Sequence, residues 1–253
     1  VLITCFLGTT EVSVYTVYML VIKGLKNIVS AITGGIDATF GDMFANKEYE
    51  NIDKKFSMYQ FFYFNIISFL YNLCLLLIVP FIQVYTKGIT DANYYRPIFA
   101  IIITLSEFVA AIKIPYDLII SSAGHFKQTK KIAYMEATIN FIISIVLIQK
   151  FGIIGVAIGT LIAYGYKTCR DIRYFSTKII KRDIKVDFKF LALIFVQLVI
   201  INIIGKVIQN NSSITGYFSW CILAVRLGVV AIIIQISTSY IFYKSKILEK
   251  VKK

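Results

Sequence analysis

Charged residues are scarce in this sequence. They account for 16% of its 253 residues, against 58% that are hydrophobic, and the mean hydropathy is +0.74. A soluble domain contains about 25% charged residues, so this shortage excludes an ordinary soluble domain and predicts a polytopic membrane protein. The net charge of +13 does not indicate nucleic acid as a partner, because the basic residues lie between apolar segments and not on one folded surface.

Side chains that usually carry catalysis or bind metals are also few. The four cysteines are far apart in the sequence and show no CxxC spacing, so we expect neither a disulfide nor a metal site. The only histidine, His125, lies in a short basic loop without a neighbouring acid, which excludes a catalytic triad and a zinc site. We therefore expect no enzymatic activity, no cofactor and no bound metal.

Long apolar runs make up most of the sequence and predict an all-α integral membrane protein. We expect seven complete transmembrane helices, over residues 12–36, 58–85, 97–121, 132–148, 152–166, 190–208 and 214–242. The first apolar run, residues 1–7, covers about a third of the ~20 residues that a spanning helix needs, and a turn over residues 8–11 follows it. We interpret the chain as a fragment that begins inside a partial N-terminal helix, without the basic segment that opens a signal peptide.

Lysine and arginine are distributed unevenly between the loops. Nineteen of the 27 lie in residues 46–55, 122–131, 167–189 and 243–253, whereas four lie in the alternate loops. Cytoplasmic loops carry the excess of these residues in membrane proteins. The asymmetry therefore predicts that the four basic segments, and with them the C-terminus, face the cytoplasm.

Several charged residues fall inside the expected spans. A charge near the centre of a bilayer costs roughly 2.5–3.5 kcal/mol on insertion scales, so it normally faces a cavity or a partner. Lys23 and Lys26 are three apart on one helix face, whereas Lys113 and Asp117 are four apart and close enough to form an ion pair. Glu107 lies about 120° around the helix from Lys113 and is expected to face elsewhere.

A second set of polar residues lies in other spans. Glu136, Asn140 and Ser144 form a stripe at i, i+4 and i+8 that we expect to face a cavity. Arg226 is roughly 18 Å into the last span. A further stripe, Asn65, Ser68 and Asn72, is more typical of contacts between helices than of a substrate site.

Purely structural interpretations of the charged residues also exist. Lys26 can reach the membrane interface by snorkelling, and Lys113 with Asp117 can be a structural ion pair. Glu136 is close enough to a basic loop to lie at the interface, and Arg226 can bind a lipid headgroup.

Residues 134–163 hold the clearest pattern. Gly155 and Gly159 form a GxxxG motif, and Ala163 continues the same face, so a neighbouring backbone can approach closely in a tight helical hairpin. Asn140, followed by Ile-Gln-Lys-Phe-Gly-x-x-Gly-x-Ala-x-Gly-Thr over residues 148–160, resembles the signature of bacterial polysaccharide (O-antigen) flippases of the Wzx type. That family belongs to the multidrug/oligosaccharidyl-lipid/polysaccharide exporter superfamily.

Two shorter segments are similar to the same family. Residues 6–18 resemble the turn into its eighth helix, and residues 40–56 resemble its Gly-Asn-Leu…Ala…Lys-Lys-Phe segment, with Asp42 in place of the more frequent Asn. The resemblance implies that residues 1–173 are the C-terminal flippase bundle of a two-bundle transporter. Residues 174–253 would then be a basic cytoplasmic connector, an extra pair of transmembrane helices and a basic tail.

The resemblance further implies a multi-pass protein of the bacterial cytoplasmic membrane that flips undecaprenyl-pyrophosphate-linked oligosaccharide by alternating access, for export of O-antigen, capsule or teichoic-type polysaccharide. Its implied partners are membrane lipids, the anionic lipid-linked oligosaccharide, the N-terminal half of the same chain and a polysaccharide polymerase. A hydrated, anionic headgroup needs cationic side chains in a wet cavity.

The anionic, pyrophosphate-linked cargo that the resemblance implies suggests roles for the intramembrane residues. Lys23 and Lys113 would hold the pyrophosphate, with Lys26 and Arg226 as further counter-charges. Asp117 or Glu136 would couple transport to an ion gradient or to the membrane potential. Glu107 and Asn140 are additional candidates for coupling or for ion pairing.

Other functions fit the same pattern. A peptidoglycan lipid-precursor flippase also carries a pyrophosphate cargo, whereas a multidrug or cation antiporter should have more acidic residues than lysines in its cavity. A membrane glycan polymerase or ligase needs catalytic groups in an outer loop, and the outer loops expected here hold neither histidine nor paired carboxylates. A half-transporter that dimerises conflicts with the truncated first helix.

Overall fold

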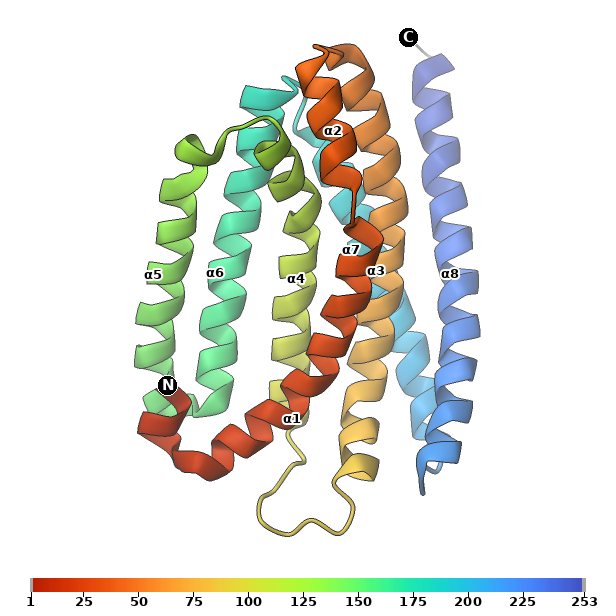
Figure 1. The fold of residues 1–253 in the computed structure, drawn as a ribbon. Coiled ribbons are helices and arrows are strands. Elements are labelled where there is room, and N and C mark those ends of the chain that lie inside the picture. Colours follow the sequence, from red (N-terminus) through yellow and green to blue (C-terminus); the bar gives the residue numbers. More distant parts are fainter. Residues whose placement is uncertain (1, 252–253) are drawn as a thin grey trace.

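The computed structural model describes residues 2–251, and the secondary structure of that part of the chain is entirely helical (Figure 1). The α-helices are α1 (Leu2–Thr33), α2 (Ile36–Ala45), α3 (Tyr49–Tyr85), α4 (Pro97–Ser122), α5 (Phe126–Phe151), α6 (Ile153–Tyr174), α7 (Lys185–Asn210) and α8 (Tyr217–Val251). A π-helix, Phe175–Ile179, follows α6 directly. Every apolar run that predicted a complete span therefore forms a helix.

The number of membrane-spanning helices differs from the prediction of seven. Six helical segments within the described residues are long and apolar enough to cross a membrane, and α1 with α2 counts as one of them. Helix α6, which covers the expected span 152–166, is not among the six. Its last two turns contain Lys167, Arg170, Asp171 and Arg173, and these charges lower its mean hydropathy.

Gly8 joins the short first segment of the chain to the rest of α1. The expected turn over residues 8–11 is reduced to a kink at this residue, where φ is 82° and ψ is 179°, and the helix continues on both sides. Figure 1 shows the first turns of α1 lying across the ends of α5 and α6. The first apolar run is thus a short helical segment packed under the bundle.

Gly35 separates α1 from α2. Its φ of 82° lies in the left-handed region, which glycine adopts without the strain that a Cβ would add. The sequence predicted a loosening of the helix here, and the structure has a break. As a result α2 leaves the direction of α1 and packs against α3 and α4.

The glycine face of α6 forms a close-packed seam with α5. A Cβ on Gly155 would collide with the backbone of Leu147, and a Cβ on Gly159 would collide with Ser144. The predicted tight hairpin of α5 and α6 is therefore confirmed. On its other side α6 packs against α4, so it lies between α4 and α5 (Figure 1).

Polar side chains join α3 to α7 and α8 within the apolar layer. Asn65 Oδ1 accepts hydrogen bonds from Gln197 Nε2 at 3.1 Å and from Ser239 Oγ at 2.7 Å. Two turns further along α3, Asn72 Oδ1 accepts a hydrogen bond from Asn202 Nδ2 of α7 at 2.6 Å. The Asn65, Ser68 and Asn72 stripe thus connects helices, as its sequence pattern favoured.

The helices place the loops alternately at two ends of the bundle. The α2–α3 and α4–α5 turns and the α6–α7 connection lie at the upper end in Figure 1, whereas the α3–α4 and α7–α8 loops lie at the lower end. The segments rich in lysine and arginine are the ones at the upper end. The predicted division of basic and non-basic loops therefore matches the two ends of the fold.

Candidate functional site

A cluster of lysines and carboxylates lies where α4, α5 and α6 meet. Lys113 Nζ is 2.8 Å from Glu136 Oε1, and both side chains are largely buried. The same ammonium lies 4.8 Å from the centre of the Tyr164 ring, a cation–π contact. Lys113 therefore pairs across to α5, and the predicted pair with Asp117 in its own helix is wrong, because Asp117 meets a different lysine on α6.

That lysine is Lys167, which bridges carboxylates from three helices. Its Nζ is 3.0 Å from Asp117 Oδ2, 3.8 Å from Glu136 Oε2 and 3.9 Å from Asp171 Oδ2. Asp171 is 0% exposed. We refer to Lys113, Asp117, Glu136, Lys167 and Asp171 as the charged cluster.

Lys167 and Asp171 were not among the predicted site residues, because the expected span ended at residue 166 and both fell in the basic loop of residues 167–189. The structure continues α6 to Tyr174. Their spacing of four residues matches that of Lys113 and Asp117 on α4. This repeated lysine and aspartate spacing is the signal in the sequence that pointed to a shared face.

A second ion pair joins α1 to α4. Lys26 Nζ lies 2.9 Å from Glu107 Oε2, with Lys26 46% and Glu107 4% exposed. The contact between Lys26 Nζ and Glu107 Oε2 does not have hydrogen-bond geometry, since Glu107 Oε2 has no hydrogen-bond partner in the described structure. The contact is therefore electrostatic, and it gives Lys26 a partner in addition to the solvent that snorkelling would provide.

Lys26, Glu107 and Lys113 line one cavity of about 190 Å³. Its other walls include Tyr71 and Tyr164. We call this space the lysine-lined cavity. The expectation that Glu107 faces away from Lys113 is wrong: both side chains line this cavity, which also includes residues of α1 and α6.

Two residues predicted to bind substrate lie elsewhere. Lys23 is exposed on α1, and Arg226 is exposed on α8; neither lines the lysine-lined cavity. No ion pair of either residue occurs within the described part of the chain. The fold therefore groups Lys26 with Lys113 and leaves Lys23 and Arg226 on outer helix surfaces.

The stripe Glu136, Asn140 and Ser144 faces α6. Ser144 Oγ donates to Asn140 Oδ1 at 3.0 Å, and Ser144 packs against Gly159. Only Glu136 joins the charged cluster. The expectation that the whole stripe faces a cavity is wrong, because close packing at the glycine seam leaves no space beside Ser144.

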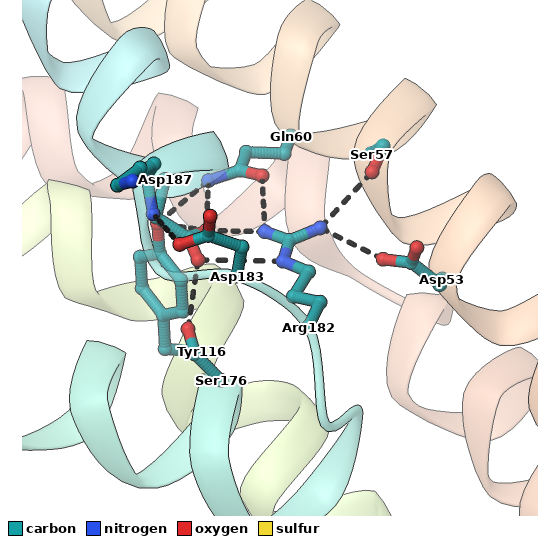
Figure 2. Close-up of polar contacts among 9 residues, drawn as sticks. Asp53, Ser57, Gln60, Tyr116, Ser176, Arg182, Asp183 and Asp187 are labelled. Carbon is teal, nitrogen blue, oxygen red and sulfur yellow. Dashed lines mark hydrogen bonds and ion pairs between the residues drawn. The ribbon is translucent and has the colours of Figure 1, made fainter. Parts of the chain in front are cut away.

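A separate buried network surrounds Arg182 at the upper end of the bundle (Figure 2). Arg182 Nη1 donates to Asp53 Oδ1 at 2.9 Å and to Ser57 Oγ at 3.0 Å, and Nη2 donates to Gln60 Oε1 at 3.0 Å. Both Nη2 and Nε also donate to Asp187. The guanidinium carbon also lies 5.2 Å from the centre of the Phe56 ring and 4.9 Å from that of Phe175, two cation–π contacts.

Asp187 is the other centre of this network. It is 0% exposed and accepts hydrogen bonds from Gln60 Nε2 at 3.1 Å, Tyr116 Oη at 3.1 Å and Ser176 Oγ at 2.8 Å, as Figure 2 shows. Every guanidinium nitrogen of Arg182 donates within the protein, so none is left for a ligand. The network is therefore structural, and it ties α7 and the π-helix to α3 and α4.

Long apolar helices around a buried charged cluster define a multi-pass membrane helix bundle. This fold is similar to a solved structure, "Lipid II flippase MurJ, inward closed conformation", with a TM-score of 0.61 and 17% sequence identity. The similarity covers 92% of this chain and 48% of that chain, so the chain spans about half the length of that flippase. No protein-family model and no curated protein matches the sequence. At this identity the likeness concerns the fold alone.

Proposed function

We propose that the chain is one helical bundle of a transporter that flips an anionic, lipid-linked saccharide across the cytoplasmic membrane. The observation that carries the proposal is that Lys26 and Lys113 line one cavity between long, predominantly apolar helices. A lysine in such a place needs an anionic partner. The fold likeness to a lipid II flippase supports the same class of cargo.

The ion pairs of the two lysines suggest how cargo binds. Glu107 and Glu136 now neutralise Lys26 and Lys113, respectively. A pyrophosphate carries more charge and more acceptor oxygens than one carboxylate, so it can replace Glu107, whose contact with Lys26 lacks hydrogen-bond geometry. Lys23 lies one turn from Lys26 on α1 and would join the site where a second bundle faces α1.

A lipid-linked cargo also needs an apolar surface for its chain. An apolar groove of about 380 Å³ lies between α1, α3 and α8, lined by residues that include Leu20, Gly24, Leu77 and Trp220. Helix α1 thus borders the groove through Gly24 and the lysine-lined cavity through Lys26. A headgroup in the cavity and a prenyl chain in the groove would lie on two sides of one helix.

The finer identity of the cargo has two candidates. The motif over residues 140–160 favours the undecaprenyl-pyrophosphate oligosaccharide of a polysaccharide pathway. The fold likeness favours a peptidoglycan lipid precursor. Complementation separates them, because restored surface polysaccharide in a polysaccharide-flippase-null strain supports the first and rescued growth of a lipid II flippase-depleted strain supports the second.

Neutral substitutions in the cavity test the transport role. Losing a hydrogen bond to a charged group costs about 1.5–3 kcal/mol, so Lys26→Gln with Lys113→Gln should lower cargo export at least about tenfold in the complementing strain. Lys206→Gln, which removes an exposed lysine of α7, is the matched control and should export at the level of the unmodified protein. Wild-type export by the double variant, at equal membrane abundance, would overturn the proposal.

A further inference from the structure

Asp171 is a buried carboxyl group without a donor. It is 0% exposed, and neither of its oxygens has a hydrogen-bond partner in the described structure. The nearest cation, Lys167 Nζ, is 3.9 Å from Oδ2, beyond hydrogen-bond distance. An ionised carboxylate in such a place normally accepts several hydrogen bonds, because burial removes its hydration. The surroundings of Asp171 therefore favour its neutral form.

The balance of charges in the charged cluster also favours a neutral Asp171. Two lysines, Lys113 and Lys167, face three carboxyl groups, Asp117, Glu136 and Asp171. Lys113 makes its short contact with Glu136 at 2.8 Å, and Lys167 makes its short contact with Asp117 at 3.0 Å. One proton balances the cluster, and Asp171 is the carboxyl group left without a short contact to a cation.

Asp117 supplies an acceptor for that proton. Asp117 Oδ2 and Asp171 Oδ2 lie 3.0 Å and 3.9 Å, respectively, from the same Lys167 Nζ, so the two carboxyl groups are neighbours across the interface of α4 and α6. Two carboxyl groups form a hydrogen bond with each other only when one of them carries a proton. The Asp117 side chain is 36% exposed, whereas Asp171 is 0% exposed. A proton can therefore pass from Asp171 to Asp117 and from there to water.

We propose that Asp171 and Asp117 form a proton-binding site in which Asp171 holds the proton and Asp117 exchanges it with solvent. When the proton leaves through Asp117, Asp171 becomes an anion and Lys167 moves toward it, away from Asp117. The movement rearranges contacts between α4 and α6, on the side of α4 that also carries Lys113. Coupling of this step to cargo movement rests on the proposed function, whereas the proton site itself does not.

Infrared spectroscopy of the protein in liposomes tests the site directly. At neutral pH the unmodified protein should show the carbonyl band of a protonated carboxyl group. Asp171→Asn, which has nearly the same shape as the neutral acid and should fold, should lose this band. Asp183→Asn removes an exposed carboxylate near the same end and should keep it. Absence of the band from the unmodified protein, or its persistence in Asp171→Asn, would overturn the proposal.

A second variant checks the charge balance between the two aspartates. Asp117→Asn leaves two carboxylates for the two lysines, so Asp171 should ionise, pair with Lys167 and lose its band at neutral pH. Persistence of the Asp171 band at neutral pH in this variant would contradict a proton site shared by Asp171 and Asp117. Transport is then measured separately under an imposed pH gradient: a gradient dependence that disappears in Asp171→Asn supports coupling. Transport that ignores the gradient in the unmodified protein overturns coupling and leaves the proton site in place.

Discussion

Individual charged residues in this bundle depend on partners from other helices. Lys113 takes its short contact from α5, Lys167 from α4 and Lys26 from α4. Each of these contacts is a consequence of which helices pack together. The sequence therefore identified most of the charged residues but assigned the wrong partner to Lys113, and it placed Lys167 and Asp171 in a loop.

Arg182, in the connection between the π-helix and α7, also has partners that its position in the sequence does not indicate. It was one of several basic residues in a connector, and nothing in its neighbourhood distinguished it from Lys181 or Lys185. The structure buries it against Asp187 and Asp53, which lie on α7 and α3. A side chain whose partner is distant in the sequence cannot be recognised as buried from local composition alone.

Removing the guanidinium of Arg182 should destabilise the protein strongly. Arg182→Met leaves Asp187 buried without a cation, and breaking a buried ion pair in this way costs about 3–5 kcal/mol. Lys178→Met, a change to an exposed residue of the π-helix, is the control and should cost less than about 0.5 kcal/mol. Denaturant unfolding in detergent measures both. Equal stability of the two variants would show that the network does not hold α7 in place.

Among the helices, the glycines of α6 determine how closely α5 can approach. Gly155 and Gly159 lie against the backbone and Ser144 of α5, respectively, whereas the added Cβ of Gly165 in the same helix would meet nothing within 4 Å. The GxxxG pattern predicted this hairpin correctly, because both glycines belong to one helix face and the partner helix follows directly in sequence. Packing between two helices that follow each other in sequence can be predicted from such a pattern. The ion pairs between α4 and α6 cannot, because their partners are distant in the sequence.

Alanine substitutions on α6 should separate packing from helix propensity. Gly155→Ala places a methyl group on the Leu147 backbone and should destabilise the protein by about 1–3 kcal/mol, the range for overpacking. Gly165→Ala meets open space and should be neutral or stabilising by up to about 1 kcal/mol, since alanine favours the helix. Thermal unfolding in detergent compares them. Equal melting temperatures would contradict the close seam.

The helices themselves were the most predictable level of the structure. Each of the seven expected spans lies largely in a helix, all but α6 belong to segments long and apolar enough to cross a membrane, and Gly35 marked the break before α2. Helix α6 deviated because it continues past the expected span, and Lys167 and Asp171 in its C-terminal turns join the charged cluster with Asp117 of α4. A prediction based on hydropathy assigns Lys167 and Asp171 to a loop, because charged residues end an apolar run.

At the scale of the whole molecule, the two ends of the bundle differ in charge. The loops at the upper end in Figure 1 carry most of the lysines and arginines, which is the reason to expect that end in the cytoplasm. The fold establishes that these loops share one end, and the side of the membrane remains a prediction.

Thiol labelling of intact cells tests this orientation. In a background without the four native cysteines, Asn93→Cys in the α3–α4 loop should react with a membrane-impermeant reagent from outside. Lys127→Cys near the α4–α5 turn should react only after permeabilisation. The opposite labelling pattern would reverse the assigned orientation.

Translocation in proteoliposomes tests most directly whether Lys26 and Lys113 receive an anionic, lipid-linked headgroup. A fluorescent undecaprenyl-pyrophosphate oligosaccharide is placed in one leaflet, and its appearance in the other is followed by an impermeant quencher. We expect translocation that needs the protein, falls at least about tenfold in Lys26→Gln with Lys113→Gln and is unchanged in Lys206→Gln. Translocation at the unmodified rate by the double variant would contradict this role of Lys26 and Lys113.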